Sequence, residues 1–297
     1  MASSKGNSNE ITREYLDSLL IETRYLDSVN PDPSFTIFGK KFSSPVMTAA
    51  LSHLDKFMYE GAMKELAQGA KDADVLMFIG MAEEAEIDDC LSTGVKMVEI
   101  IKPYADRDVI YRKIGHAERA GLLAVGIDID HPFAGDGSDD VVDGQRMKAL
   151  TMKELAKICD ASHLPVIVKG VLSMKDAEKS LAAGAGGLLL SHHNNRIEYA
   201  IPPLYILPDI AAMTARRVPI FVDCEIATGM DVFKALCLGA AAAGIGRPLM
   251  GAMKKDHAKG VTDYLNQARD ELKKAMAFTC CKDLSQPEKS IIHKRNF

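Results

Sequence analysis

The stretch that decides the fold reads LPVIVKG at residues 164–170, SHHNNR at 191–196, VPIFVD at 218–223 and AAAGIGRP at 241–248. Each segment joins an apolar, strand-like run to polar or charged residues at its end. These residues are Lys169, His193, Arg196, Asp223 and Arg247. All strands of a parallel β/α barrel open their carboxyl ends onto one face. The pattern therefore indicates one site built from four distant segments.

Similar apolar runs recur along most of the chain and alternate with helical patterns. Eight strands are predicted to begin near residues 45, 75, 95, 122, 165, 186, 218 and 241. They are almost continuously apolar, which is typical of strands that are covered on both faces. Eight β/α units predict an α/β fold, a single (β/α)8 TIM barrel. A doubly wound open sheet is the alternative, but it seldom needs eight such units.

The remaining segments give a helical layer and one long loop. Helices are predicted at residues 11–26, 106–120, 151–161, 173–184, 229–239 and 261–278. Thr151 and Glu154 have the spacing of a capping box. The chain is divided into an N-terminal polar tail and helix (1–30) and a barrel domain (31–297). A turn-rich, acidic segment of about 20 residues follows the fourth strand, and loops of that length are usually functional lids or disordered.

Composition excludes several classes of function. The 297 residues are 47% hydrophobic and carry a net charge of −5, which argues against a nucleic-acid-binding surface. No apolar run approaches the ~20 residues of a membrane helix, and the polar N-terminus lacks a signal core. We expect a soluble, cytoplasmic protein. The six cysteines lack CxxC spacing, so we expect neither a disulfide framework nor a metal site.

The order and spacing of these motifs resemble the FMN-dependent α-hydroxy-acid oxidases and dehydrogenases, a family that includes glycolate oxidase and lactate oxidase. The match is strong over residues 164–248 and weaker over 25–130. The resemblance implies an FMN cofactor, a small carboxylate substrate and a homo-oligomer, often a tetramer. It leaves open whether dioxygen or a protein carrier reoxidises the flavin.

The resemblance also implies roles for the strand-end residues. His193 matches the catalytic base, and Asp130 matches the aspartate that stabilises its charged form. Arg196 matches the arginine that grips the substrate carboxylate, a pairing that both binds and orients. Lys169 matches the lysine beside flavin N1, where a fixed ammonium stabilises the charge of the reduced ring.

Further positions match contacts to the cofactor. Asp223 corresponds to the aspartate that binds the ribityl hydroxyls. Arg247 corresponds to the arginine at the phosphate, where Gly246 allows close backbone approach. The end of the first strand is expected to present backbone groups to the flavin, from Thr48, Ala49 and Ala50.

The third and fourth strands depart from the family pattern. The family has Gln-x-Tyr at the end of the third strand, where this chain has Glu99, Ile100 and Ile101. The substrate-binding tyrosine is thus absent, and Tyr104 is the candidate to replace it. Lys102 is a further candidate to meet an anion. A threonine near the flavin pyrimidine edge is replaced by Asp128, so Glu99 and Asp128 are predicted to place acidic groups there.

Two arginine sites are also altered. The family's second substrate arginine lies in the long loop after the fourth strand, where Arg146 is this chain's one arginine. The phosphate motif Gly-Gly-x-Arg-Arg-Gly is replaced by CEIATG at residues 224–229, which removes both arginines and introduces Glu225. Phosphate binding is therefore expected to depend on Arg247 and on backbone amides.

The leading hypothesis is an FMN-dependent oxidoreductase that converts a small 2-hydroxy acid to the 2-oxo acid, or runs the reverse reaction. One alternative is a divergent flavin-dependent reductase or isomerase supplied with electrons by a nicotinamide or a partner. Another is a non-catalytic barrel that binds a flavin or a different ligand, since fold alone does not establish activity.

Overall fold

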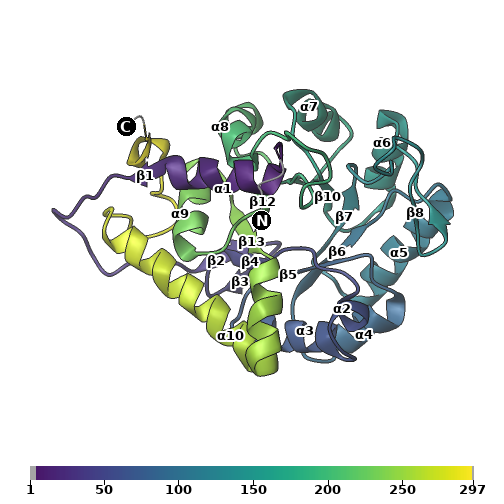
Figure 1. The fold of residues 1–297 in the computed structure, drawn as a ribbon, viewed down its shortest axis with the longest axis horizontal. Coiled ribbons are helices and arrows are strands. Elements are labelled where there is room, and N and C mark those ends of the chain that lie inside the picture. The colour runs from purple at the N-terminus through teal and green to yellow at the C-terminus, as the bar shows by residue number, and fades with distance from the viewer. Residues whose placement is uncertain (1–4, 296–297) are drawn as a thin grey trace.

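A computed structural model describes residues 5–295 of the chain. Eight parallel strands lie in the order β4-β13-β12-β11-β10-β7-β6-β5 (Figure 1). Bridges from Met47 to Leu76 and from Leu51 to Ile79 join the first strand of this order to the last and close the barrel. The strands are β4 (Val46–Thr48), β5 (Met77–Gly80), β6 (Met97–Ile101), β7 (Ala124–Asp128), β10 (Val166–Lys169), β11 (Gly187–Leu190), β12 (Ile220–Val222) and β13 (Ala242–Ile245). The predicted TIM barrel is confirmed, and each of the eight predicted strands is present.

Alternation along each strand separates two apolar clusters. Phe78, Ile100 and Phe221 belong to a cluster inside the barrel. Met97 and Ile101, on the other face of β6, join the larger cluster between sheet and helices. Because side chains alternate with a period of two, Glu99 also faces the helices.

Most predicted helices agree with the structure to within one or two residues. The helical layer comprises α2 (Leu54–Phe57), α3 (Ala62–Asp72), α4 (Glu84–Leu91), α5 (Arg107–Ala120), α6 (Met152–Ala161), α7 (Met174–Ala182), α8 (Pro203–Thr214), α9 (Gly229–Cys237) and α10 (Arg247–Ala277). Thr151 and Glu154 form the predicted capping box at the start of α6. The last helix is longer than predicted, because α10 continues through a kink at Asp256 and His257.

The N-terminal prediction was wrong in its extent. Helix α1 (Ser8–Ser18) ends eight residues before the predicted position, and the chain continues into strand β1 (Leu19–Ile21). This strand pairs antiparallel with β14 (Ile292–Lys294), which follows the short helix η1 (Lys289–Ile291). Pairing with the opposite end of the chain overrides the local helical pattern. The first four residues of the predicted polar tail lie outside the described part.

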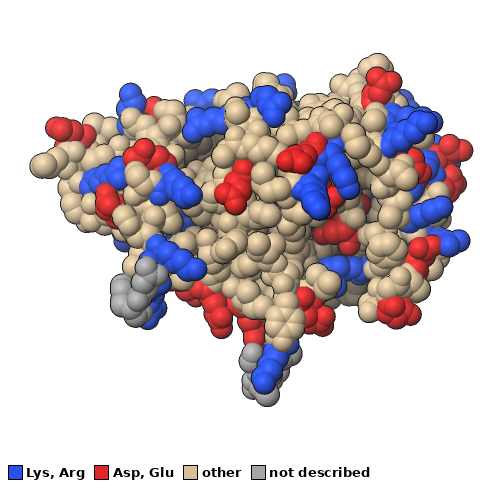
Figure 2. Space-filling model, turned by 90° about the horizontal axis from the view of Figure 1, so that it is seen from above, with Lys and Arg blue, Asp and Glu red and all other residues tan. Residues whose placement is uncertain are grey.

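Two small hairpins complete the fold. Strands β2 (Phe35–Ile37) and β3 (Lys40–Phe42) place Phe35 and Phe42 in the inner cluster. Strands β8 (Val141–Val142) and β9 (Gln145–Arg146) order part of the predicted loop. Figure 2 shows acidic and basic side chains interspersed over one face, without a continuous basic patch. No helix within residues 5–295 is long and apolar enough to cross a membrane.

Candidate active site

The carboxyl ends of neighbouring strands bring four charged residues into contact. Lys169 on β10 lies in register with Asp128 on β7. The Lys169 Nζ atom is 3.1 Å from Nδ1 of His193, which follows β11. Helix α7 separates these two residues in the sequence, so the contact shows that the strand ends form one cluster.

His193 is held by Asp130. Its Nδ1 atom lies 2.9 Å from Oδ1 of Asp130. Because an ionised carboxylate only accepts hydrogen bonds, Nδ1 carries the hydrogen and Nε2 of the neutral ring has the free lone pair. Burial and Lys169 oppose the charged imidazolium, but Asp128 and Asp130 outweigh them and raise the pKa of His193. The pair is therefore arranged to receive a proton at Nε2.

Gly170 makes room for this pair. Its φ of +92° favours glycine, and a Cβ there would lie 2.4 Å from Cγ of Asp130. Any side chain at position 170 would displace the aspartate. The glycine after Lys169 thus serves the His193–Asp130 contact as well as the turn.

Asp128 is fully buried between two ammonium groups. Its carboxylate lies 2.6 Å from Nζ of Lys102 and 3.3 Å from Nζ of Lys169. Burial alone would raise the pKa of Asp128, but Lys169, His193 and Lys102 together hold it well below its usual range. Burial and the adjacent Asp128 raise the pKa of Asp130. The two carboxylates therefore differ in proton affinity although they are close together.

The cluster contains residue types that ligate metals. Ligand atoms of Asp128, Asp130 and His193 lie within 4.8 Å of one another. Lys102 and Lys169 already contact Asp128 and supply the compensating positive charge. We interpret the group as a site for handling protons, not as a metal centre.

Arg196 is bound to the loop that follows β7. Its Nη2 atom lies 2.6 Å from Oδ2 of Asp140 and also donates to the carbonyl oxygen of Phe133. His131 contacts the same aspartate at 3.1 Å and packs against the His193 ring, with centroids 4.9 Å apart. Burial and the surrounding cations lower the pKa of His131 to about 3. Arg196 is thus connected to His193 through Asp140 and His131, and its guanidinium already binds a carboxylate of the chain.

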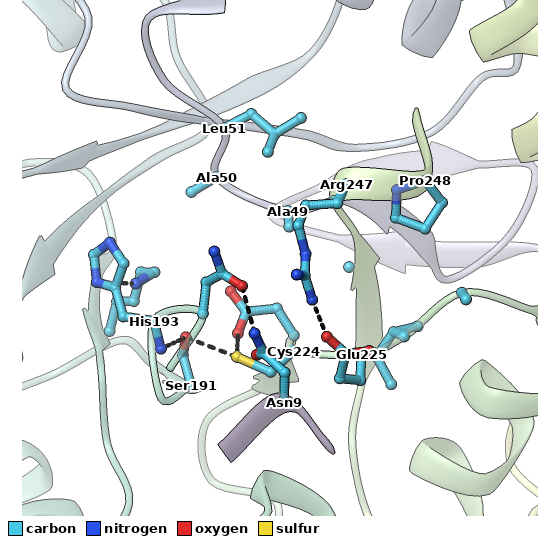
Figure 3. Close-up of a pocket in the computed structure, with 17 residues that line it drawn as sticks. Asn9, Ala49, Ala50, Leu51, Ser191, His193, Cys224, Glu225, Arg247 and Pro248 are labelled. Atoms are coloured by element: carbon cyan, nitrogen blue, oxygen red, sulfur yellow. Dashed lines mark hydrogen bonds and ion pairs between the residues drawn. The ribbon is translucent and has the colours of Figure 1, made fainter. Parts of the chain in front are cut away.

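A cavity of about 510 Å³ opens next to this cluster. His193 lines one part of it, and Glu225 and Arg247 line another (Figure 3). Lys169 also lines the cavity, 3.1 Å from His193. Its walls also include Ala49, Ala50, Leu51, Asn9, Ser191, Asn194, Asp223, Cys224, Ile226, Ala227, Gly244, Gly246 and Pro248. Small residues shape it closely: a Cβ on Gly244 would lie 3.2 Å from the backbone nitrogen of Ala49. The cavity suits a flat group that packs against backbone.

Three predicted site residues contact neither the His193–Asp130 pair nor the cavity wall. Glu99 faces α5 and lies 3.4 Å from Nζ of Lys113. Tyr104 is buried in the cluster between sheet and helices. Arg146 is exposed and pairs with Asp139 of its own loop. None of them is placed to bind substrate or flavin in this structure.

The prediction for Glu99 was wrong because alternate residues of β6 point to opposite faces of the sheet. Ile100 faces the barrel interior, so its neighbour Glu99 faces outward and Lys102 points back to the site. Lys102, directly after β6, thus joins the charged cluster. The Thr48 hydroxyl bonds the Phe78 backbone of β5, and Thr48 is not part of the cavity wall.

Helix α1 supplies a cavity residue that the sequence did not reveal. The side-chain amide of Asn9 donates to Oδ1 of Asn194 at 2.9 Å. Ser8 and Thr12 of the same helix bond Asn195 and His192. No motif marks these polar residues, since ordinary helix N-termini carry the same types.

Comparison with known proteins identifies the family. The model of the family described as FMN-dependent dehydrogenase matches residues 2–148 and 136–294. The chain belongs to the FMN-dependent dehydrogenase family. It is 28% identical to glycolate oxidase of Spinacia oleracea, over 94% of this chain and 86% of that protein. Glycolate oxidase 1 of Oryza sativa subsp. indica is also 28% identical, over 95% and 86%.

Solved structures of mandelate oxidase are similar in fold. A variant of mandelate oxidase with (S)-mandelic acid superposes with a TM-score of 0.88 at 25% identity, covering 99% of this chain and 91% of that one. Mandelate oxidase with (S)-2-phenylpropionate gives the same score, identity and coverage. Another mandelate oxidase variant, with a C4a-OH-FMN adduct, has a TM-score of 0.86 at 25% identity, covering 99% and 92%.

The residues of the cavity fit the flavin ring and the ribityl chain of FMN, the cofactor of the family. Lys169 is a buried cation at a cavity wall, and Asp223 is a buried carboxylate at the same wall. Ala49, Ala50 and Gly244 leave backbone accessible to a flat ring. Burial opposes the charge of Lys169, but Asp128, Asp130 and Asp223 raise its pKa, so the ammonium persists. The phosphate end differs, because there Arg247 is paired with Glu225.

Proposed function

We propose that this protein oxidises a small 2-hydroxy acid to the corresponding 2-oxo acid. The observation that carries the proposal is the contact of His193 with Asp130 beside Lys169, at the edge of the cavity. FMN, when bound, supplies the acceptor for the two electrons that leave the α-carbon. In this proposal the chain provides a base, a carboxylate anchor and a cation near the acceptor.

His193 receives the proton of the substrate hydroxyl at Nε2. Asp130 fixes the ring through Nδ1 and stabilises the imidazolium that forms. Such a positioned base contributes about 10²–10⁴-fold to a rate. The buried Oδ2 of Asp130 has no hydrogen-bond partner within the described residues, whereas Oδ1 bonds Nδ1 of His193.

Arg196 and Lys102 are the proposed contacts of the substrate carboxylate and hydroxyl. Lys102 Nζ lies 3.4 Å from Nε2 of His193, where the substrate oxygen must approach. Its ammonium has three N–H donors, and Asp128 accepts one of them. In this proposal another is directed to the substrate, and Nε2 of His193 stays free to accept the proton.

The domain division, assembly and location are proposals as well. We propose that residues 31–297 form the FMN-binding barrel and that residues 1–30 form a tail and helix against it. A homotetramer in the cytoplasm is proposed from the family resemblance and from the composition. The electron acceptor is left open.

Anaerobic reduction of the bound flavin tests the function. The flavin-loaded protein is mixed with glycolate, lactate, mandelate and longer 2-hydroxy acids, and the loss of flavin absorbance is followed. We expect at least one acid to reduce the flavin, and His193→Gln to slow that reduction by about 10²-fold or more while flavin remains bound. Reduction by a nicotinamide and by none of the acids would overturn the proposal.

A further inference from the structure

Glu225 and Arg247 form an ion pair inside the cavity. Arg247 follows β13, Glu225 follows β12, and both side chains line the wall (Figure 3). The Arg247 side chain is 53% exposed and that of Glu225 is 19% exposed. The cation that the family resemblance assigns to phosphate is therefore already neutralised by this chain's own carboxylate.

The other charges at this end do not restore a positive site. Arg13 of α1 reaches the same loop and donates to the carbonyl oxygen of Glu225 at 3.0 Å. Its guanidinium is shared between Asp231 at 2.9 Å and Asp17 at 2.7 Å. Arg13 is thus balanced by two carboxylates and adds no net positive charge.

Backbone amides at the start of α9 also donate to carboxylates of the chain. Asp231 accepts from the N–H groups of Ala227 and Thr228 at 3.2 and 3.1 Å. Glu271 accepts from the N–H of Gly229 at 2.8 Å. A helix N-terminus otherwise attracts phosphate, but here carboxylates of the chain already accept from these three amides.

Glu225 is held in a conformation that favours glycine. Its φ is +59° and that of Cys224 is +71°. A non-glycine residue in this left-handed region carries a backbone penalty, and such strain persists only where the surroundings fix it. The ion pair with Arg247 is the contact that holds the Glu225 side chain at the cavity.

We propose that Glu225 makes this cavity nearly indifferent to the cofactor phosphate. A phosphate that binds Arg247 must displace Glu225 or share the guanidinium with it, and either arrangement places like charges close together. A flavin that ends in a neutral hydroxyl leaves the pair intact. The chain then binds riboflavin about as tightly as FMN, because the ring and ribityl contacts are common to both.

Flavin binding by the full-length protein tests this. Flavin is removed by dialysis against a chaotropic salt, and quenching of flavin fluorescence is titrated with FMN and with riboflavin. The wild-type protein is expected to prefer FMN by less than about tenfold. Glu225→Gln is expected to tighten FMN binding by about tenfold, with riboflavin binding changed less than twofold, in line with the removal of one charge at a partly exposed site.

The controls separate charge from shape. Glu178→Gln removes an exposed carboxylate on α7, outside the cavity, and is expected to change neither affinity. Raising the salt concentration is expected to weaken the binding of FMN to Glu225→Gln but not the binding of riboflavin. A wild-type preference for FMN above tenfold would refute the proposal. So would a substitution of Glu225 that alters both flavins equally or alters neither.

Discussion

Glu99 gives a pH-dependent stability that can be worked out from its surroundings. The side chain is fully buried against α5, and one of its oxygens has no hydrogen-bond partner within residues 5–295. Burial raises its pKa from 4.5 to about 7, although Lys113 at 3.4 Å acts in the opposite direction. The folded protein therefore binds this proton more tightly than the unfolded chain does.

The sign and size follow from that shift. A raised carboxyl pKa gives stability that is fully present below about pH 4.5 and is lost as the pH rises to about 7. At 1.36 kcal/mol for each pKa unit, the loss is about 3 kcal/mol. Above pH 7 the ionised Glu99 thus costs stability that the protonated form does not.

Glu99→Gln removes this titration with little change of shape. Urea unfolding of the flavin-free protein at pH 5 and pH 8 gives the free energies to compare. Relative to the wild type, the variant is expected to gain about 2.5 kcal/mol between pH 5 and pH 8, because part of the wild-type loss already occurs below pH 5. Lys113→Met removes the favourable charge and is expected to enlarge the wild-type loss. Parallel pH dependence in the wild type and Glu99→Gln would show that Glu99 does not titrate in this range.

Three further predictions concern the proposed site. Asp140→Asn weakens the ion pair between Arg196 and Asp140. It is therefore expected to lower the apparent dissociation constant for the 2-hydroxy acid about 3- to 10-fold in anaerobic flavin reduction. A higher dissociation constant would mean that Asp140 orients Arg196 for the substrate. Lys102→Met is expected to raise the apparent dissociation constant for the 2-hydroxy acid about tenfold. It is also expected to destabilise the fold by about 3 kcal/mol in urea unfolding, because Asp128 loses its 2.6 Å partner. An unchanged dissociation constant would show that Lys102 does not contact the substrate. The rate of flavin reduction is expected to rise with pH through the raised pKa of His193, since the base must be neutral. Asp130→Asn is expected to slow the reaction and to move this rise in rate to lower pH. An unshifted pH profile would contradict the pairing of His193 with Asp130.

The barrel could be predicted from the sequence because its signals are local. Each strand is a short apolar run, and turn or cap residues mark the neighbouring helices, as Thr151 and Glu154 do for α6. Parallel strands also place their ends at one face whatever the loops do. The convergence of Lys169 and His193 therefore needed no knowledge of long-range packing.

The remaining features depend on contacts that no local pattern encodes. The predicted helix past Ser18 fails because residues 19–21 pair with the opposite end of the chain. The face of Glu99 depends on a register that one residue reverses, so an apolar run could not fix it. The contact of Arg196 with Asp140 depends on how an acidic loop folds back, and several aspartates of that loop were equally plausible partners.

Helix α1 has a consequence for how the cofactor is exchanged. Three of its residues bond the loop that carries His193, and Asn9 forms part of the cavity wall. A flavin that leaves past this wall must wait for the helix to detach. The residence time of the cofactor then depends on how often helix α1 detaches. Shortening this helix would speed the release of flavin even where the equilibrium affinity of the protein for the flavin ring changed little.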